Sequence, residues 1–118
     1  MRRHATTTAL AIVLLTLVGC TTSTKPTRPG KYEQTWRTPY SSTSCGNYLT
    51  TLDAHQQWVL AADMLTGARK VDGATVLPDD TDVDRFRQDI TTACEAQATA
   101  MTTEVGATLY LLDPSYKP

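Results

Sequence analysis

Two cysteines, Cys45 and Cys94, constrain the fold of this 118-residue chain more than any other feature. They lie in a body of about seventy residues, a size at which one hydrophobic core rarely suffices without a covalent or metal staple. A disulfide between them would stabilise the body by about 4 kcal/mol through its effect on the unfolded chain. The alternative is that both thiols stay reduced in the core. Metal binding is a poor option, because the sequence has no C-x-x-C motif and His55 is the only histidine after residue 19.

The first 19 residues have the layout of a secretory signal. A short basic segment, Met1–His4, leads into an apolar run over residues 9–18. That run is about ten residues long, whereas a membrane-spanning helix needs roughly 20. A basic start followed by a short apolar stretch is typical of a signal peptide. We therefore expect this segment to direct export and to be removed.

The end of the signal resembles the lipobox of bacterial lipoproteins. In Leu17-Val18-Gly19-Cys20 a leucine and a small residue precede a cysteine in the order of that motif. The resemblance implies cleavage before Cys20 and lipidation of its sulfur, which would anchor the chain to the extracytoplasmic side of the cell membrane. A non-lipidated signal or a buried cysteine are the alternatives. In such an oxidising setting the remaining pair, Cys45 and Cys94, favours a disulfide.

Charge divides the expected mature chain, residues 20–118, into two parts. Residues 21–44 carry a net charge of +3, whereas residues 45–113 carry a net charge of −7. A basic segment next to the lipid would suit an anionic bilayer surface, although solvated charges can scatter in this way without any role. The body has no basic patch, so we do not expect nucleic acid as a partner.

Residues 20–44 are expected to form a flexible stalk. Eleven of the residues from 21 to 44 are Ser or Thr, and such a segment buries too little apolar surface to become ordered. Three aromatic residues, Tyr32, Trp36 and Tyr40, recur in it at intervals of four. They would either strap across the core of the body or lie at the lipid interface, and we favour the strap.

The body, residues 45–113, has the sequence of a small all-α helical bundle, and residues 114–118 form a tail. Ser44 is placed to cap a short helix over residues 45–49, and Asp53 with Gln56 forms a capping box for a helix over 53–70. Residues 71–80 are predicted to form a loop. An apolar stripe then predicts one long helix over 83–105 that ends at Gly106. Residues 109–112 would add a short helix or an extended tail.

Enzymatic chemistry is not indicated. Residues 80–84 briefly resemble a calcium loop, but Arg85 replaces the required glycine and Thr91 the required glutamate. Acidic residues in a first helical turn explain the run without a metal. His55 has no activated nucleophile near it in the sequence pattern. We expect neither catalysis, nor a metal, nor a cofactor.

The segment around Cys45 resembles the HdeA family of small periplasmic acid-stress chaperones. Cys45-Gly46-Asn47-Tyr48-Leu49 followed by Asp53 matches the opening C-x-x-[FY]-L…D of that family, in which a second cysteine follows at nearly the distance of Cys94. The resemblance covers roughly residues 45–105. It implies a helical bundle stapled by one disulfide and a chaperone function. The lipid anchor, the long stalk and the scarcity of lysine depart from the family pattern.

Two functions follow as expectations. One is an acid-responsive chaperone, in which protonation of carboxylates near the start of the second long helix loosens the body and opens a face formed by Trp58, Phe86 and Ile90 for unfolded clients. The other is a surface interaction lipoprotein, such as a receptor-blocking or exclusion factor of a phage or plasmid, or an adaptor for a membrane partner. The first requires low pH, whereas the second requires one specific protein partner at neutral pH.

Overall fold

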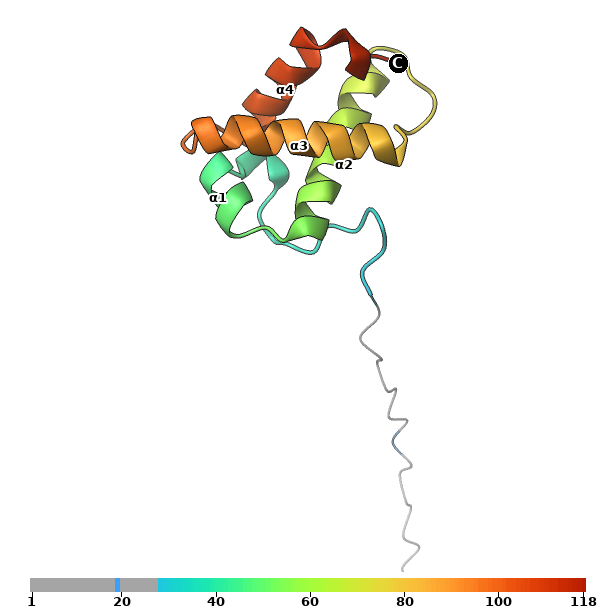
Figure 1. The fold of residues 1–118 in the computed structure, drawn as a ribbon. Coiled ribbons are helices and arrows are strands. Elements are labelled where there is room, and N and C mark those ends of the chain that lie inside the picture. Colours follow the sequence, from blue (N-terminus) through green and yellow to red (C-terminus); the bar gives the residue numbers. More distant parts are fainter. Residues whose placement is uncertain (1–18, 20–27) are drawn as a thin grey trace, which may run out of the picture.

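The computed structural model describes residue 19 and residues 28–118 and shows a small helical bundle (Figure 1). Within these residues the secondary structure is entirely helical. Four α-helices and two short 3-10 helices follow one another as η1 (Tyr40–Ser42), α1 (Cys45–Thr50), α2 (Ala54–Val71), α3 (Asp80–Ala96), α4 (Thr102–Leu112) and η2 (Pro114–Tyr116). The predicted all-α fold is confirmed.

The starts of the first two α-helices are fixed by their predicted capping residues. The Ser44 hydroxyl accepts a hydrogen bond from the Asn47 backbone N–H at the start of α1. At the start of α2 the Asp53 carboxylate accepts from the Gln56 N–H, and the Gln56 side chain accepts from the Asp53 N–H. Each cap satisfies backbone donors that have no partner within the helix. Both helices therefore begin where the sequence predicts.

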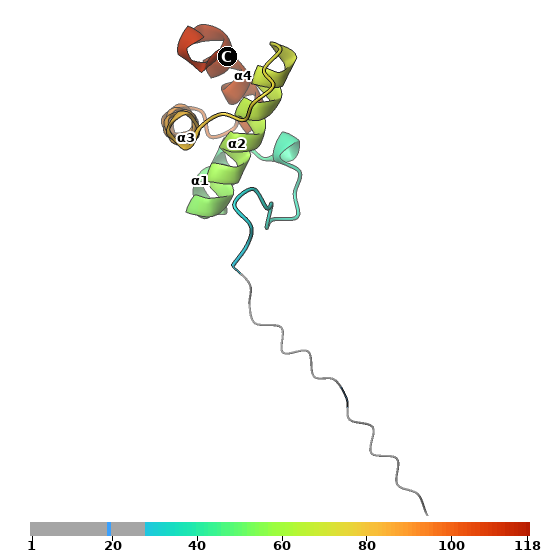
Figure 2. The same ribbon diagram turned by 90° about the vertical axis from the view of Figure 1, so that its right-hand side faces the viewer.

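The core lies where α2, α3 and α4 meet. α2 packs against both α3 and α4, and α1 lies against α3 (Figures 1 and 2). The centre is formed by side chains from the four α-helices and from η2 that are almost completely excluded from solvent. The largest of them are Tyr48, Leu60, Leu65, Phe86, Ile90 and Tyr116.

Cys45 and Cys94 form the predicted disulfide, which joins the first turn of α1 to the last turn of α3. Their Cα atoms lie 4.8 Å apart, and both residues are fully buried. Tyr48, one turn further along α1, adds a hydrogen bond between its hydroxyl and the Thr91 hydroxyl of α3. The bridge thus fastens a helix too short to be stable alone onto the core.

The prediction of one continuous helix over 83–105 is wrong. α3 ends at Ala96, a turn follows, and the chain reverses into α4, which begins at Thr102. The carbonyl groups of Ala98 and Ala100 in this turn accept hydrogen bonds from the backbone N–H groups of Gly46 and Cys45. These bonds satisfy the free donors at the start of α1, so the turn is fixed by a partner distant in sequence.

Gly106 does not terminate a helix but lies in the middle of α4. A Cβ atom at this position would lie 1.8 Å from the Met64 Cε atom, because α2 and α4 approach each other closely here. The glycine therefore leaves room for the end of the Met64 side chain between α2 and α4 and does not mark a helix end. Residues 109–112, predicted as a helix or an extended tail, form the last turn of α4.

The aromatic residues before η1 contact the domain. The rings of Tyr32 and Trp58 lie 5.5 Å apart, and Trp36 and Tyr40 pack against the core. The backbone carbonyl of Glu33 lies 3.3 Å from His55 Nε2, and the Thr35 hydroxyl accepts from the Gln56 amide. These contacts agree with the strap interpretation, so we call residues 31–42 the strap.

Candidate interaction surfaces

The three residues predicted to form an apolar interaction face do not form a surface in this folded state. Phe86 and Ile90 are buried in the core. Trp58 is half-buried, with Tyr32 against its ring and the Lys31 ammonium 5.3 Å from its centre. A partner would reach these side chains only after the strap had moved and the helices had separated.

Exposed apolar side chains gather instead at the end of the bundle where α2 and α4 finish. We call this the distal end, because the chain enters the domain through the strap at the opposite end (Figure 1). Large apolar residues rarely stay this exposed without a role when they cluster. At the distal end the exposed fractions are 88% for Val71, 71% for Leu111 and 78% for Leu112, and in the loop that leads from α2 to α3 they are 78% for Val76 and 59% for Leu77.

Two shallow hollows lie among these side chains. One, of about 270 Å³, has Val71 and Leu111 in its walls together with Ala68 and Ala107. The other is lined by Val76 and Leu77 of the loop after α2. The two hollows have no lining residue in common, so the one that contains Val71 and Leu111 belongs to the distal end and the other to the side of α2.

A group of polar contacts holds the C-terminal segment onto the distal end. The Tyr110 hydroxyl donates a hydrogen bond of 2.6 Å to Asp72 Oδ2, and Lys117 Nζ lies 2.9 Å from the same oxygen. These bonds from Tyr110 and Lys117 hold the pKa of Asp72 below its usual range. Burial of the phenol, followed by the bond to Asp72, raises the pKa of Tyr110 to about 12. The contact therefore depends on an ionised Asp72.

The side chain of Tyr116 is buried in the core and holds the C-terminal segment there. Its ring packs edge-on against Phe86 at 4.9 Å, and its hydroxyl donates to Asp89 Oδ2. Arg69, although charged, is buried on α2, where its Nε donates to the Tyr116 carbonyl and its Nη2 to Asp82 Oδ2. The last residues of the chain are thus part of the fold.

The acidic residues near the start of α3 all make contacts within the domain. Asp79 caps the helix by accepting from the Asp82 N–H. Asp80 pairs with Lys31 of the strap at 2.6 Å, and Asp84 lies 4.0 Å from Arg87. Residues 80–84, the segment that resembles a calcium loop, form the first turn of α3.

The sequence interpretation missed the roles of Tyr110, Tyr116, Arg69 and Asp72. Tyr110 lies in the segment predicted as a short helix or an extended tail, and Tyr116 lies in the predicted tail over residues 114–118. Their aromatic side chains are the signal in the sequence that points to burial. Arg69 follows Leu65 by four positions and so lies on the buried face of α2, which is a weaker signal. The partner of Asp72 could not be found from sequence, because it lies 38 positions away.

Some predicted features lie outside what the structure describes. Cys20, the predicted lipidation site, and the signal segment except Gly19 are outside the described residues. Among the residues that are described, no helix is long and apolar enough to cross a membrane. Residues 28–118 contain no cluster of three His, Cys, Asp or Glu side chains arranged to hold a metal ion. His55 lies at the surface beside the strap.

Comparison with protein-family models, with curated proteins and with solved structures finds no match to this chain. The resemblance to the HdeA family therefore stays an expectation that rests on the motif around Cys45 and the position of Cys94 in the sequence.

Proposed function

We propose that this chain is a non-enzymatic lipoprotein of the cell envelope that binds another protein through its distal end. The observation that carries the proposal is the group of exposed apolar side chains, Val71, Leu111 and Leu112, where α2 and α4 finish at the end of the bundle opposite the strap. A lipid on Cys20 would hold the strap side toward the membrane and leave the distal end facing outward. Receptor blocking, exclusion or an adaptor role would all use a surface placed in this way.

The anchor is tested by Cys20→Ala. This variant should remain an unprocessed precursor or be released as soluble protein, because no other residue of the motif can form the thioether. Detergent phase partition and intact mass of the isolated protein measure the change. Normal maturation of Cys20→Ala with unchanged partition into the detergent phase would refute lipid anchoring.

The distal end is tested by Leu111→Ser combined with Leu112→Ser. Both side chains are largely exposed, so their replacement should leave the thermal unfolding temperature nearly unchanged. Affinity capture from crosslinked envelopes should recover one specific protein with the unmodified chain and lose it with the double variant. A matched control is Thr92→Ala on α3, which is exposed and distant from the distal end. Equal recovery of the partner by all three proteins would contradict the proposal.

An acid-activated chaperone is the second candidate, and the contacts of the C-terminal segment favour it. The pKa of Asp72 is lowered by Tyr110 and Lys117, and the pKa of Asp113 is lowered by hydrogen bonds from Ser115. Protonation of the two carboxylates in acid would weaken the contacts that hold η2 and the end of α4. The disulfide would still hold α1 to α3, so the domain would open at one end and expose the aromatic residues beneath.

This candidate is tested by acidifying the protein together with an aggregation-prone client to about pH 2–3, below the usual carboxylate range. The chaperone function predicts less client aggregation and a rise in the binding of an apolar dye. Unchanged aggregation without dye binding would reject it and leave the interaction at neutral pH as the function.

A further inference from the structure

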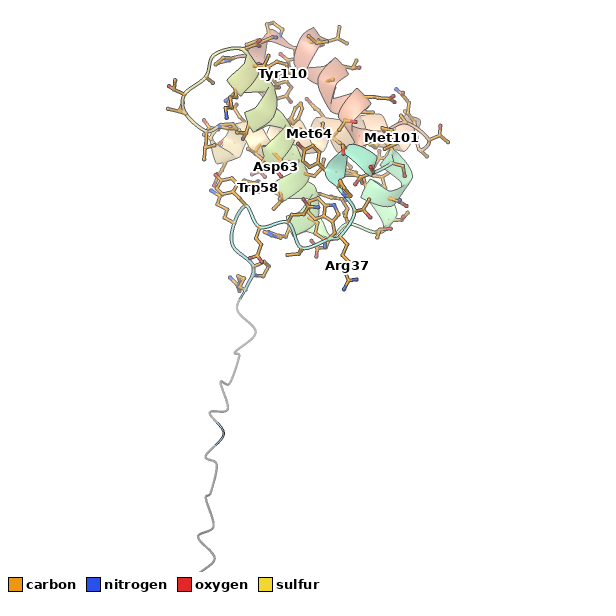
Figure 3. The ribbon with its side chains drawn as sticks, turned by 180° about the vertical axis from the view of Figure 1, so that it is seen from behind. Arg37, Trp58, Asp63, Met64, Met101 and Tyr110 are labelled. Atoms are coloured by element: carbon orange, nitrogen blue, oxygen red, sulfur yellow. A yellow bond between two sulfur atoms is a disulfide. The ribbon has the colours of Figure 1, made fainter. Side chains whose placement is uncertain are left out.

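A narrow groove runs beside α2 on the face of the bundle shown in Figure 3. It lies between α2, α4 and η1, has a volume of about 220 Å³, and Phe86 contributes to its floor. Asp63 is the only charged residue among those that line it. The remaining lining residues are uncharged: Tyr40, Met64, Gly67, Ala68, Thr103, Gly106 and Ala107.

Asp63 has no partner within the domain. No salt bridge or hydrogen bond joins its carboxylate to any residue from 28 to 118, although the other acids of the distal end and of α3 are mostly paired. Partial burial without compensation raises the pKa of this carboxyl. Arg37 of the strap lies away from Asp63 and points out from the bundle (Figure 3). The carboxylate is thus partly desolvated and free to receive a cation from outside.

The size of the groove limits what can enter it. Sites for small molecules usually enclose about 300–1,000 Å³, so this groove is too small for most of them. It is large enough for one long side chain. Lysine and arginine combine an apolar stem, which suits the walls formed by Met64 and Ala107, with a cationic end that suits Asp63. Tyr40 also lines the groove, and an aromatic ring is a further group that can contact a cation.

We propose that this groove receives one lysine or arginine side chain of a protein partner, with the stem against the apolar walls and the cation at the Asp63 carboxylate. A basic side chain on the partner is thus expected, and this inference rests on the protein-binding role proposed above. It concerns a different surface from the distal end, so the two contacts can be tested separately.

Two features of the walls suit an entering side chain. Gly67 lies one turn after Asp63 on α2, and a Cβ atom placed there would meet nothing within 4 Å. Glycine inside a helix costs about 1 kcal/mol relative to alanine, and here it keeps the groove open beside the carboxylate. Met64 is flexible and half-buried, so it can adjust to an occupant.

The experiment uses the chain purified from envelope membranes in detergent, with its methionine methyl groups labelled with ¹³C. The probe is a short helical peptide of alanine and leucine with one central lysine, and the comparison peptides carry arginine, norleucine or glutamine at that position. Met64 reports on the groove, and Met101, which lies elsewhere on the same face, is the internal control (Figure 3). Spectra and Kd values are measured at neutral pH.

The lysine and arginine peptides should shift the Met64 methyl signal and leave that of Met101 unchanged. Asp63→Asn and replacement of the basic residue by norleucine should each raise Kd about tenfold. Gly67→Leu should fill the groove and abolish the Met64 shift, although the helix stays intact. The control Glu95→Gln removes an exposed carboxylate of α3 and should leave Kd unchanged.

Equal affinity for the lysine and norleucine peptides, or for the unmodified chain and Asp63→Asn, would overturn the proposal. A Met64 shift with free butylamine as large as with the peptide would also overturn it, because the site would then be one for small amines. Failure of the proposed function gives a different pattern. The Leu111→Ser and Leu112→Ser variant would then capture the same proteins as the unmodified chain, whatever the peptides show.

Discussion

At the scale of single residues, Asp63 on α2 and Asp72 just after that helix show how its surroundings decide the effect of a carboxylate on stability. Asp72 accepts hydrogen bonds from Tyr110 and Lys117, and its pKa is lowered. Asp63 is partly buried without a partner, and its pKa is raised. Ionised Asp72 therefore stabilises the fold, whereas ionised Asp63 destabilises it.

Asp72→Asn and Asp63→Asn should change stability in opposite directions at neutral pH. Because the folded pKa of Asp72 lies below its unfolded value of about 4, its stabilisation is complete above that value and is lost as pH falls through the folded pKa. Asp72→Asn should therefore lower the free energy of unfolding at pH 7, with the loss vanishing in strong acid. Asp63→Asn should raise it, because a desolvated charge is removed. Urea unfolding at several pH values measures both, and a loss for Asp72→Asn that persists below the folded pKa would contradict the assignment.

At the scale of elements, the two glycines of the groove region have different structural roles. Gly67→Ala should stabilise the protein by about 0.5–1 kcal/mol, because alanine favours the helix and its Cβ meets no atom. Gly106→Ala should give no such gain, because its Cβ would displace the end of Met64. Thermal unfolding of the two variants tests the difference. An equal gain for both would mean that α2 and α4 are not packed as closely as described.

The disulfide between α1 and α3 makes a further prediction at this scale. Cys45→Ser should lower the free energy of unfolding by about 4 kcal/mol, because the closed span of 49 residues constrains the unfolded chain. The reduced protein should be less stable by a similar amount. Intact mass should show freshly isolated protein two hydrogens lighter than the reduced chain. Two free thiols in such a preparation would contradict the disulfide between Cys45 and Cys94.

Local signals in the sequence were enough for α1, α2 and their caps, because each cap acts within three positions. The break between α3 and α4 could not be predicted in the same way. The apolar stripe continues in phase through Met101 and Val105, and the turn over residues 97–100 contains neither glycine nor proline. Its hydrogen bonds go to the start of α1, more than fifty positions earlier. A tertiary contact therefore decides this boundary.

The candidate surfaces were harder to predict than the helices. Trp58, Phe86 and Ile90 are apolar, as predicted, but apolar residues at helical spacing mark the face that is buried, and two of the three lie in the core. The exposed residues Val71 and Leu112 lie at helix ends, where periodicity no longer separates inner from outer positions. Their exposure becomes visible only once the helices are placed.

At the scale of the whole molecule, the chain joins the domain at one end, and exposed apolar side chains lie at the other. The strap joins the chain to the domain beside Trp58, and the apolar contacts lie where α2 and α4 finish (Figures 1 and 2). A lipid on Cys20 would place the strap end of the domain toward the membrane and the distal end away from it. The groove at Asp63 lies between the two ends and adds a charged contact to the apolar ones.

The most direct test of the proposed binding role is site-specific photo-crosslinking in intact cells. A photoreactive amino acid replaces Leu112 at the distal end or, as the control, the exposed Thr50 on α1. One discrete crosslinked protein is expected from position 112 at neutral pH and none from position 50. The same products from both positions, or no product from position 112, would contradict the claim that this protein acts through its distal end.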